Sequence, residues 1–101
     1  MLEIEVRELE KWSQKSKGLM GQIPYPVFFK TRWGIHTFFM KASIDVVILD
    51  SKGYIATLKP ALKPWRVLVW NPRYEQVLEL PKGTIEKMKL KKGSRVQLIF
   101  I

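Results

Sequence analysis

The residues best suited to chemistry lie in one stretch, from His36 to Asp50. The stretch holds the single histidine of the chain and places two carboxylates, Asp45 and Asp50, around a strongly apolar run. Imidazole titrates near neutral pH and a carboxylate can orient it, so His36 and Asp45 are candidates for an acid–base pair. A half-buried histidine bonded to a backbone carbonyl, to Thr37 or to an aspartate fits the same residues.

Asp45 begins the most apolar predicted strand of the chain, over residues 44–50. A buried carboxylate without a partner is costly. Asp45 must therefore bind backbone amides, pair with a base such as Arg66 or Arg95, or lie at the rim, where it would contact a ligand. Asp50 opens the turn 50–53, and aspartate at such a position commonly bonds its own backbone, so we expect a structural role for it.

Trp65 and Arg66 are neighbours in a loop-rich region. An indole beside a guanidinium can form a stacking or anion-binding lip. In a small β domain, however, aromatic side chains usually fill the core and seal the sheet edges. The second role is the prediction for the aromatic residues near the loops, which are Trp33, Phe38, Phe39, Trp65 and Trp70.

Several classes of site are excluded or disfavoured. The chain has no cysteine, which excludes disulfides, thiolate metal sites and cysteine nucleophiles. A zinc site would have only His36 and carboxylates as ligands, so no metal is expected. The six glycines form no phosphate-binding loop, and a G-x-S-x-G motif is missing. No cofactor is predicted, and an enzyme is disfavoured without being excluded.

The chain is basic, with 18 Lys and Arg against 9 Asp and Glu and a net charge of +9. Such a surface attracts polyanions, nucleic acid included, through a salt-sensitive field. It also simply keeps a protein dissolved. The sequence shows neither a signal-peptide pattern nor the roughly 20 apolar residues of a membrane span. We therefore expect a cytoplasmic protein without a membrane partner.

Hydrophobic periodicity predicts the architecture. The 101 residues, of which 47% are hydrophobic, suit one domain over residues 1–101. Because no long helix alternates with the strands, we predict a mainly β (α+β) fold, mostly antiparallel. It would be a sandwich or jelly-roll-like fold, or a partly open barrel, with two short peripheral helices. The predicted strands are 2–6, 27–31, 36–41, 44–50, 54–59, 65–70, 75–80 and 95–101, and the predicted helices are 9–20 and 84–88, the latter capped by Thr84.

Four blocks of the sequence, in order, resemble a widespread bacterial and archaeal family of unknown function, the domain family numbered 192. The resemblance implies a β-rich sandwich or jelly-roll domain and no established activity. It also implies that His36, Thr37, Asp45 and Arg66 form one shared site or a polar network that stabilises the fold. The blocks are Lys17–Gly21, His36–Asp50, Pro64–Arg66 and Val77–Val96.

Three functions follow as hypotheses. The first is a non-catalytic binding module for a small or anionic ligand. The second is a nucleic-acid-associated module that uses charge and exposed aromatic residues, and the third is an enzyme with His36 and Asp45 as its acid–base pair. The predicted ligand-binding residues are His36, Thr37, Asp45, Trp65 and Arg66.

Overall fold

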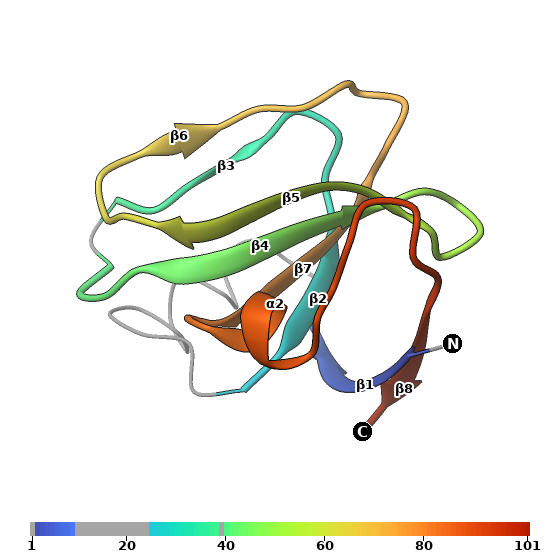
Figure 1. Ribbon diagram of the computed structural model, residues 1–101. Helices are drawn as coiled ribbons and strands as arrows, with labels where there is room; N and C mark the ends of the chain where they lie inside the picture. The colour runs from blue at the N-terminus through green and yellow to red at the C-terminus, as the bar shows by residue number, and fades with distance from the viewer. Residues whose placement is uncertain (1, 10–24, 39) are drawn as a thin grey trace.

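The computed structural model describes residues 2–9, 25–38 and 40–101, with principal dimensions of 33 × 28 × 25 Å. Within these residues a six-stranded sheet carries a separate two-stranded ribbon on one face and a short helix on the other (Figure 1). The helix predicted over 9–20 falls, except for its first residue, outside the described residues. The fold is mainly β, as predicted.

The six-stranded sheet curls into a half-barrel, which is the partly open barrel among the predicted forms. Its strands run in the order β5-β4-β7-β2-β1-β8. The pairs β5–β4, β4–β7 and β7–β2 are antiparallel, whereas β2–β1 and β1–β8 are parallel. The strands are β1 (Leu2–Glu8), β2 (Val27–Lys30), β4 (Ile44–Leu49), β5 (Ile55–Leu62), β7 (Gln76–Pro81) and β8 (Val96–Phe100).

Strand β4 lies inside the sheet, between β5 and β7, and is fully buried, as its two apolar faces predict. Its side chains alternate between two hydrophobic clusters, one on each face of the sheet. Val47 and Leu49 lie in the cluster that also contains Ile85 of the helix α2 (Thr84–Lys87). Val46 and Ile48 lie in the other cluster, on the face that the ribbon covers.

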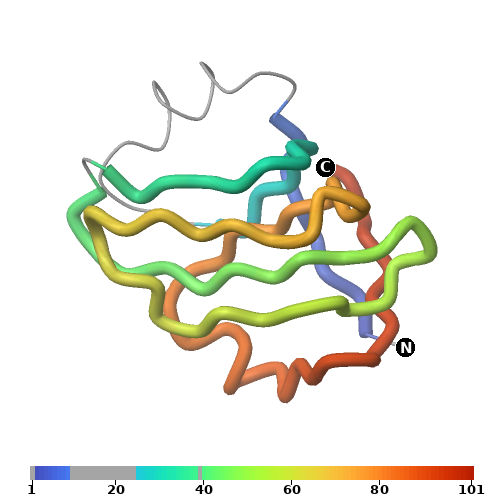
Figure 2. Tube along the Cα trace, turned by 90° about the horizontal axis from the view of Figure 1, so that it is seen from above, coloured from blue at the N-terminus to red at the C-terminus, as the bar shows by residue number. Residues whose placement is uncertain are grey.

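The ribbon consists of β3 (Ile35–His36) and β6 (Val67–Leu68), which pair antiparallel. Its inward residues Ile35 and Leu68 pack against the cluster that contains Val46 and Ile48. Figure 2 shows the ribbon from above. Gly34 permits this close pairing, because its φ is +142° and an added Cβ would lie 2.5 Å from the Leu68 carbonyl oxygen. Both strands are shorter than the predicted 36–41 and 65–70.

Two local predictions meet different outcomes. Asp50 holds its turn, as expected, because its Oδ1 accepts the N–H groups of Lys52 and Tyr54 at 2.8 and 3.0 Å. Thr84 does not cap α2, and that prediction is wrong. Its hydroxyl donates to the Pro81 carbonyl at 2.6 Å, and Gly83 occupies the N-cap position without a side-chain cap of its own.

Candidate functional site

Thr37 joins the end of the ribbon to the turn that carries Trp65. Its side chain is 1% exposed. The hydroxyl donates to the Lys63 carbonyl at 2.6 Å and accepts the Arg66 N–H at 2.9 Å. The backbone adds two bonds, because the Thr37 N–H donates to the Arg66 carbonyl at 2.9 Å and its carbonyl accepts the Trp65 N–H at 3.1 Å. The turn 63–66 is therefore fixed from both ends by one buried residue.

Trp65 stands out from this turn in an unusual conformation. Its φ is +62°, a left-handed geometry that costs a non-glycine residue roughly 1–2 kcal/mol. The indole is 57% exposed. The Phe38 ring lies 5.6 Å from it, at an interplanar angle of 27°, and the His36 ring lies 4.7 Å from Phe38 at 29°. These three stacked rings, His36, Phe38 and Trp65, form what we call the aromatic ridge.

His36 contributes to the ridge by stacking its imidazole ring on the Phe38 ring. Its Nδ1 accepts the backbone N–H of Phe38 at 3.2 Å, so this nitrogen carries the lone pair rather than the proton in this geometry. The ring is half-buried. His36 and Thr37 are thus neighbours with different tasks, since one presents a ring and the other holds a turn.

Asp45 lies away from the ridge, on the face of the sheet that carries α2. Its Oδ1 accepts the N–H of Ala61 at 2.9 Å, and its Oδ2 accepts those of Gly83 and Ile85 at 3.1 and 2.9 Å. The carboxylate is 1% exposed and is held by backbone amides, so of the three alternatives for Asp45 the structure shows this one and not the pairing with Arg66 or Arg95. At the start of α2 the Asp45 carboxylate accepts the amides that a local N-cap side chain would otherwise accept.

Asp45 nevertheless acts on the turn that carries Trp65. Opposite it, β5 has one extra residue, since Val46 pairs with Lys59 and Ile44 pairs with Leu62. The bond to Ala61, whose φ is +52°, fixes this bulge, and the bulge leads directly into the turn 63–66. The Asp45 carboxylate thus holds the backbone two residues before the turn that carries Trp65.

Arg66 lies at the exposed side of the same turn. Its Nη1 donates to the carbonyls of Pro64 and Trp65 at 3.4 and 3.5 Å, both long distances. Of the five predicted site residues, the structure brings together His36, Thr37, Trp65 and Arg66. The fifth, Asp45, supports them from the opposite face of the sheet.

The family model DUF192, described as "Uncharacterized ACR", matches residues 1–98. The chain belongs to the DUF192 family. UPF0127 proteins of Pyrococcus horikoshii and Pyrococcus furiosus are 32% and 30% identical to it, over 92% and 95% of this chain and 86% and 88% of theirs. The predicted family membership is confirmed.

Two solved structures share the fold of this DUF192 domain. A protein of unknown function from Novosphingobium aromaticivorans has a TM-score of 0.74 and 14% identity, over 89% of this chain and 71% of that one. A protein from Sinorhizobium meliloti, named as a candidate transcription regulator, has a TM-score of 0.68 and 23% identity, over 89% and 78%. At these identities the likeness concerns the fold alone.

The DUF192 domain exposes more aromatic surface than the sequence predicts. Trp33 is 78% exposed, and Phe38 and Trp65 are exposed as well, so the prediction that these three fill the core is wrong. Trp70 does pack against the second hydrophobic cluster. Phe39 lies outside the described residues. A hollow of about 300 Å³ runs along the ribbon, between Trp33, Gly34, Ile35, His36, Phe38, Val67 and Val69.

Two segments of the DUF192 domain around the ridge contain basic residues and no acidic ones. The segments 31–44 and 51–74, which contain β3, β5 and β6, have no Asp or Glu. Arg32 forms an ion pair with Glu75, at 3.2 Å. Asp45, between the two segments, is buried in its three amide bonds. The basic residues of these segments are Arg32, Lys41, Lys52, Lys59, Lys63, Arg66 and Arg73.

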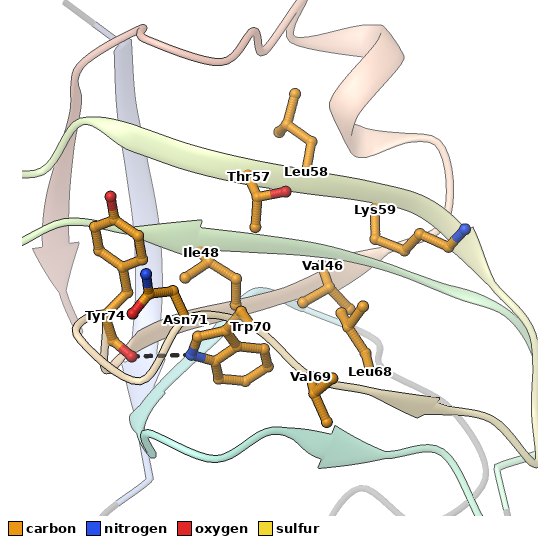
Figure 3. A pocket seen from close by; sticks show the side chains of 10 residues that line it. All are labelled: Val46, Ile48, Thr57, Leu58, Lys59, Leu68, Val69, Trp70, Asn71 and Tyr74. Atoms are coloured by element: carbon orange, nitrogen blue, oxygen red, sulfur yellow. Dashed lines mark hydrogen bonds between the residues drawn. The ribbon is translucent and has the colours of Figure 1, made fainter.

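Two further features lie outside the predicted site. Glu79 is fully buried and pairs in register with Val27 and Val46, on the face that the ribbon covers. The sequence pattern of the predicted strand 75–80 did not indicate that Glu79 is buried. Beside the ribbon, a second and larger hollow separates β6 from β5 (Figure 3).

No three His, Asp or Glu side chains gather as metal ligands within residues 2–9, 25–38 and 40–101. In the same residues no helix has the length and apolar character of a membrane span.

Proposed function

We propose that this DUF192 domain is a non-catalytic binding module for a small anionic ligand that contains a ring. The ligand would stack on the aromatic ridge of His36, Phe38 and Trp65. One observation carries the proposal, which is the strained and exposed conformation of Trp65. Glycine would adopt this φ without strain, yet a large aromatic residue occupies the position, and a tryptophan that sealed the core would be buried.

The ridge is also ready before a ligand arrives. The four bonds between Thr37 and the turn 63–66 hold Trp65 in place. A surface that is already ordered loses less conformational entropy on binding. This favours direct stacking of a small ring on the exposed indole.

The charge around the ridge favours an anion. Arg66 follows Trp65 directly, and Lys63 precedes it by two residues. The surrounding segments add no negative charge. Phosphate or carboxylate groups beside the stacked ring would meet a positive field from several side chains.

Binding without catalysis is favoured over an acid–base enzyme. The three amide bonds of Asp45 occupy both of its oxygens, on the opposite face of the sheet from the ribbon. Asp45 is thus engaged elsewhere and is a poor partner for the His36 imidazole.

The test is a titration of the 15N-labelled protein with AMP, which combines a flat ring with a phosphate. AMP should shift the amide signals of residues 36–38 and 63–67. Trp65→Ala should raise the Kd at least fivefold, because base–aromatic stacking contributes about 1–3 kcal/mol. The matched control is Tyr54→Ala, an exposed aromatic whose ring also has an arginine close by, at the opposite end of β5.

Two outcomes would contradict the proposal. One is an equal loss of AMP binding in Trp65→Ala and Tyr54→Ala. The other is saturation of the same signals by inorganic phosphate alone, at the same concentration as AMP, because the ring would then contribute nothing.

Nucleic acid is the second candidate ligand. The basic segments and the exposed rings suit single-stranded nucleic acid, and the Sinorhizobium meliloti protein of the same fold is named as a candidate transcription regulator. A single-stranded oligonucleotide would then bind far more tightly than AMP, with an affinity that falls steeply with salt. Equal affinities for the two at low salt would exclude this alternative.

A further inference from the structure

The hollow between β5 and β6 is a groove of about 360 Å³, a size at the lower end of the range for small-molecule sites. It shares no residue with the aromatic ridge. The fully buried Val46 and Ile48 of β4 lie at its base, and the two walls come from β5 and from the segment that contains β6 (Figure 3). The wall residues are Thr57, Lys59, Leu68, Val69, Trp70, Asn71 and Tyr74, together with Leu58, whose side chain points to the other face of the sheet.

The wall opposite β5 is fixed by its own hydrogen bonds. The Trp70 Nε1 donates to the Tyr74 carbonyl at 2.9 Å, as Figure 3 shows. The Tyr74 N–H donates to the Asn71 carbonyl at 3.0 Å, and the Arg73 N–H donates to the Asn71 Oδ1 at 3.0 Å. Because the single polar atom of the indole already has a partner, the ring offers the groove an apolar surface.

Gly34 explains why β6 does not close this space. With no Cβ, Gly34 lets the Leu68 carbonyl and the Val69 side chain approach β3. Strand β6 thereby pairs closely with β3, and the side of β6 that faces β5 has no strand partner in the described residues. The groove is a consequence of the backbone arrangement.

The polar groups of the groove lie at its rim, and its one cationic side chain, Lys59, lies at one end. In Figure 3 the Lys59 side chain extends along β5 toward the end of the groove opposite Tyr74. Thr57 lies on the same strand and is exposed. None of the ten lining residues is acidic. The groove thus combines an apolar floor, a fixed indole and one terminal positive charge.

We propose that this groove is a binding site for a small carboxylic acid with a hydrocarbon body. The hydrocarbon lies over Val46 and Ile48 against the face of Trp70, and the carboxylate lies at the Lys59 ammonium. This site is separate from the ridge, so it does not depend on the function proposed above.

Octanoate, below its micelle-forming concentration, is the probe. In a titration of the 15N-labelled full chain it should shift the amides of residues 57–59 and 68–71 and the Trp70 indole N–H. Thr57→Phe places a ring in the groove from an exposed strand position and should abolish these shifts. Lys59→Met retains the aliphatic stem and removes the charge, so it should raise the Kd two- to fivefold.

The controls separate charge from simple apolar binding. Lys52→Met removes a lysine at the far end of the β4–β5 hairpin and should leave the Kd unchanged. The alcohol 1-octanol should bind the natural chain less tightly than octanoate does. To Lys59→Met the alcohol and the acid should bind equally well. Octanoate shifts that survive Thr57→Phe would overturn the site. Equal binding of acid and alcohol to the natural chain would overturn the carboxylate assignment.

Discussion

The backbone carbonyl of buried Thr37 accepts the N–H of exposed Trp65 at 3.1 Å, so one of the most buried polar residues holds one of the most exposed aromatic residues. The Thr37 hydroxyl reinforces this contact on both sides of Trp65, at Lys63 and at Arg66. Trp65 keeps its left-handed backbone because its neighbours are fixed. The stability of the turn and the geometry of the ridge should therefore change together.

Thr37→Val tests this coupling. Valine has nearly the same shape but lacks the hydroxyl, so the Lys63 carbonyl and the Arg66 N–H lose their partner. We expect a loss of about 1–3 kcal/mol in the free energy of unfolding, measured by urea denaturation. Thr37→Ser keeps the hydroxyl and should recover most of that loss. Equal stabilities for Val and Ser variants would contradict a role for the hydroxyl.

Asp45 and Asp50 should respond differently to the same replacement by asparagine. Asp45 uses both oxygens to accept amides, so an asparagine NH₂ would face at least one N–H donor. Asp50 uses only its Oδ1 for the two turn amides, and asparagine suits such turns. We expect Asp45→Asn to cost about 3 kcal/mol of unfolding free energy and Asp50→Asn less than about 0.5 kcal/mol. Similar losses in both would contradict this interpretation.

Gly34 should tolerate alanine less well than Gly93 does. Both have positive φ, at +142° and +90°, but only at Gly34 would the new Cβ meet backbone, 2.5 Å from the Leu68 carbonyl oxygen. We expect Gly34→Ala to cost about 3 kcal/mol or more, and Gly93→Ala about 1–2 kcal/mol. Thermal or urea unfolding measures the difference. A larger loss for Gly93→Ala would mean that the ribbon does not need this close approach.

Trp65→Gly separates stability from binding. Glycine relieves the strained φ, whereas the lost ring contact with Phe38 is worth about 0.5–1.5 kcal/mol. The two effects nearly cancel, so we expect the unfolding free energy to change by less than about 1 kcal/mol while AMP binding at the ridge is lost. The comparison is Trp70→Ala, which removes a half-buried ring from the second cluster and should cost about 2–4 kcal/mol. A large loss of stability in Trp65→Gly would point to a structural role for this tryptophan.

Much of the fold follows from local pattern. The run 44–50 is apolar on both faces, and it forms the fully buried strand β4. The alternation along this strand also assigns Asp45 to the face of Val47 and Leu49, and the structure places α2 on that face. The turn at Asp50 is equally local, because its partners lie two and four residues away. Interactions this short need no knowledge of the rest of the chain.

The candidate site depends on contacts between distant segments. The Thr37 hydroxyl meets the Lys63 carbonyl 26 residues away, and Asp45 meets the Ile85 amide 40 residues away. The type of residue shows only that a buried carboxylate needs partners, and amides and arginines satisfy that need equally well. The parallel pairing of β1 with β8 joins strands far apart in the sequence, and hydrophobic periodicity does not predict it either.

The sequence by itself determined a mainly β domain with a buried strand at 44–50, a structural turn at Asp50 and a basic composition without cysteine. Only the tertiary structure decided that Asp45 supports the ridge from the other face of the sheet, and that Trp33, Phe38 and Trp65 face outward. The physical reason is that hydrophobic periodicity depends on neighbours along a strand. The exposure of an aromatic ring depends instead on which distant backbone covers it, and at Trp65 hydrogen bonds to distant Thr37 fix the backbone of the turn that carries the exposed ring.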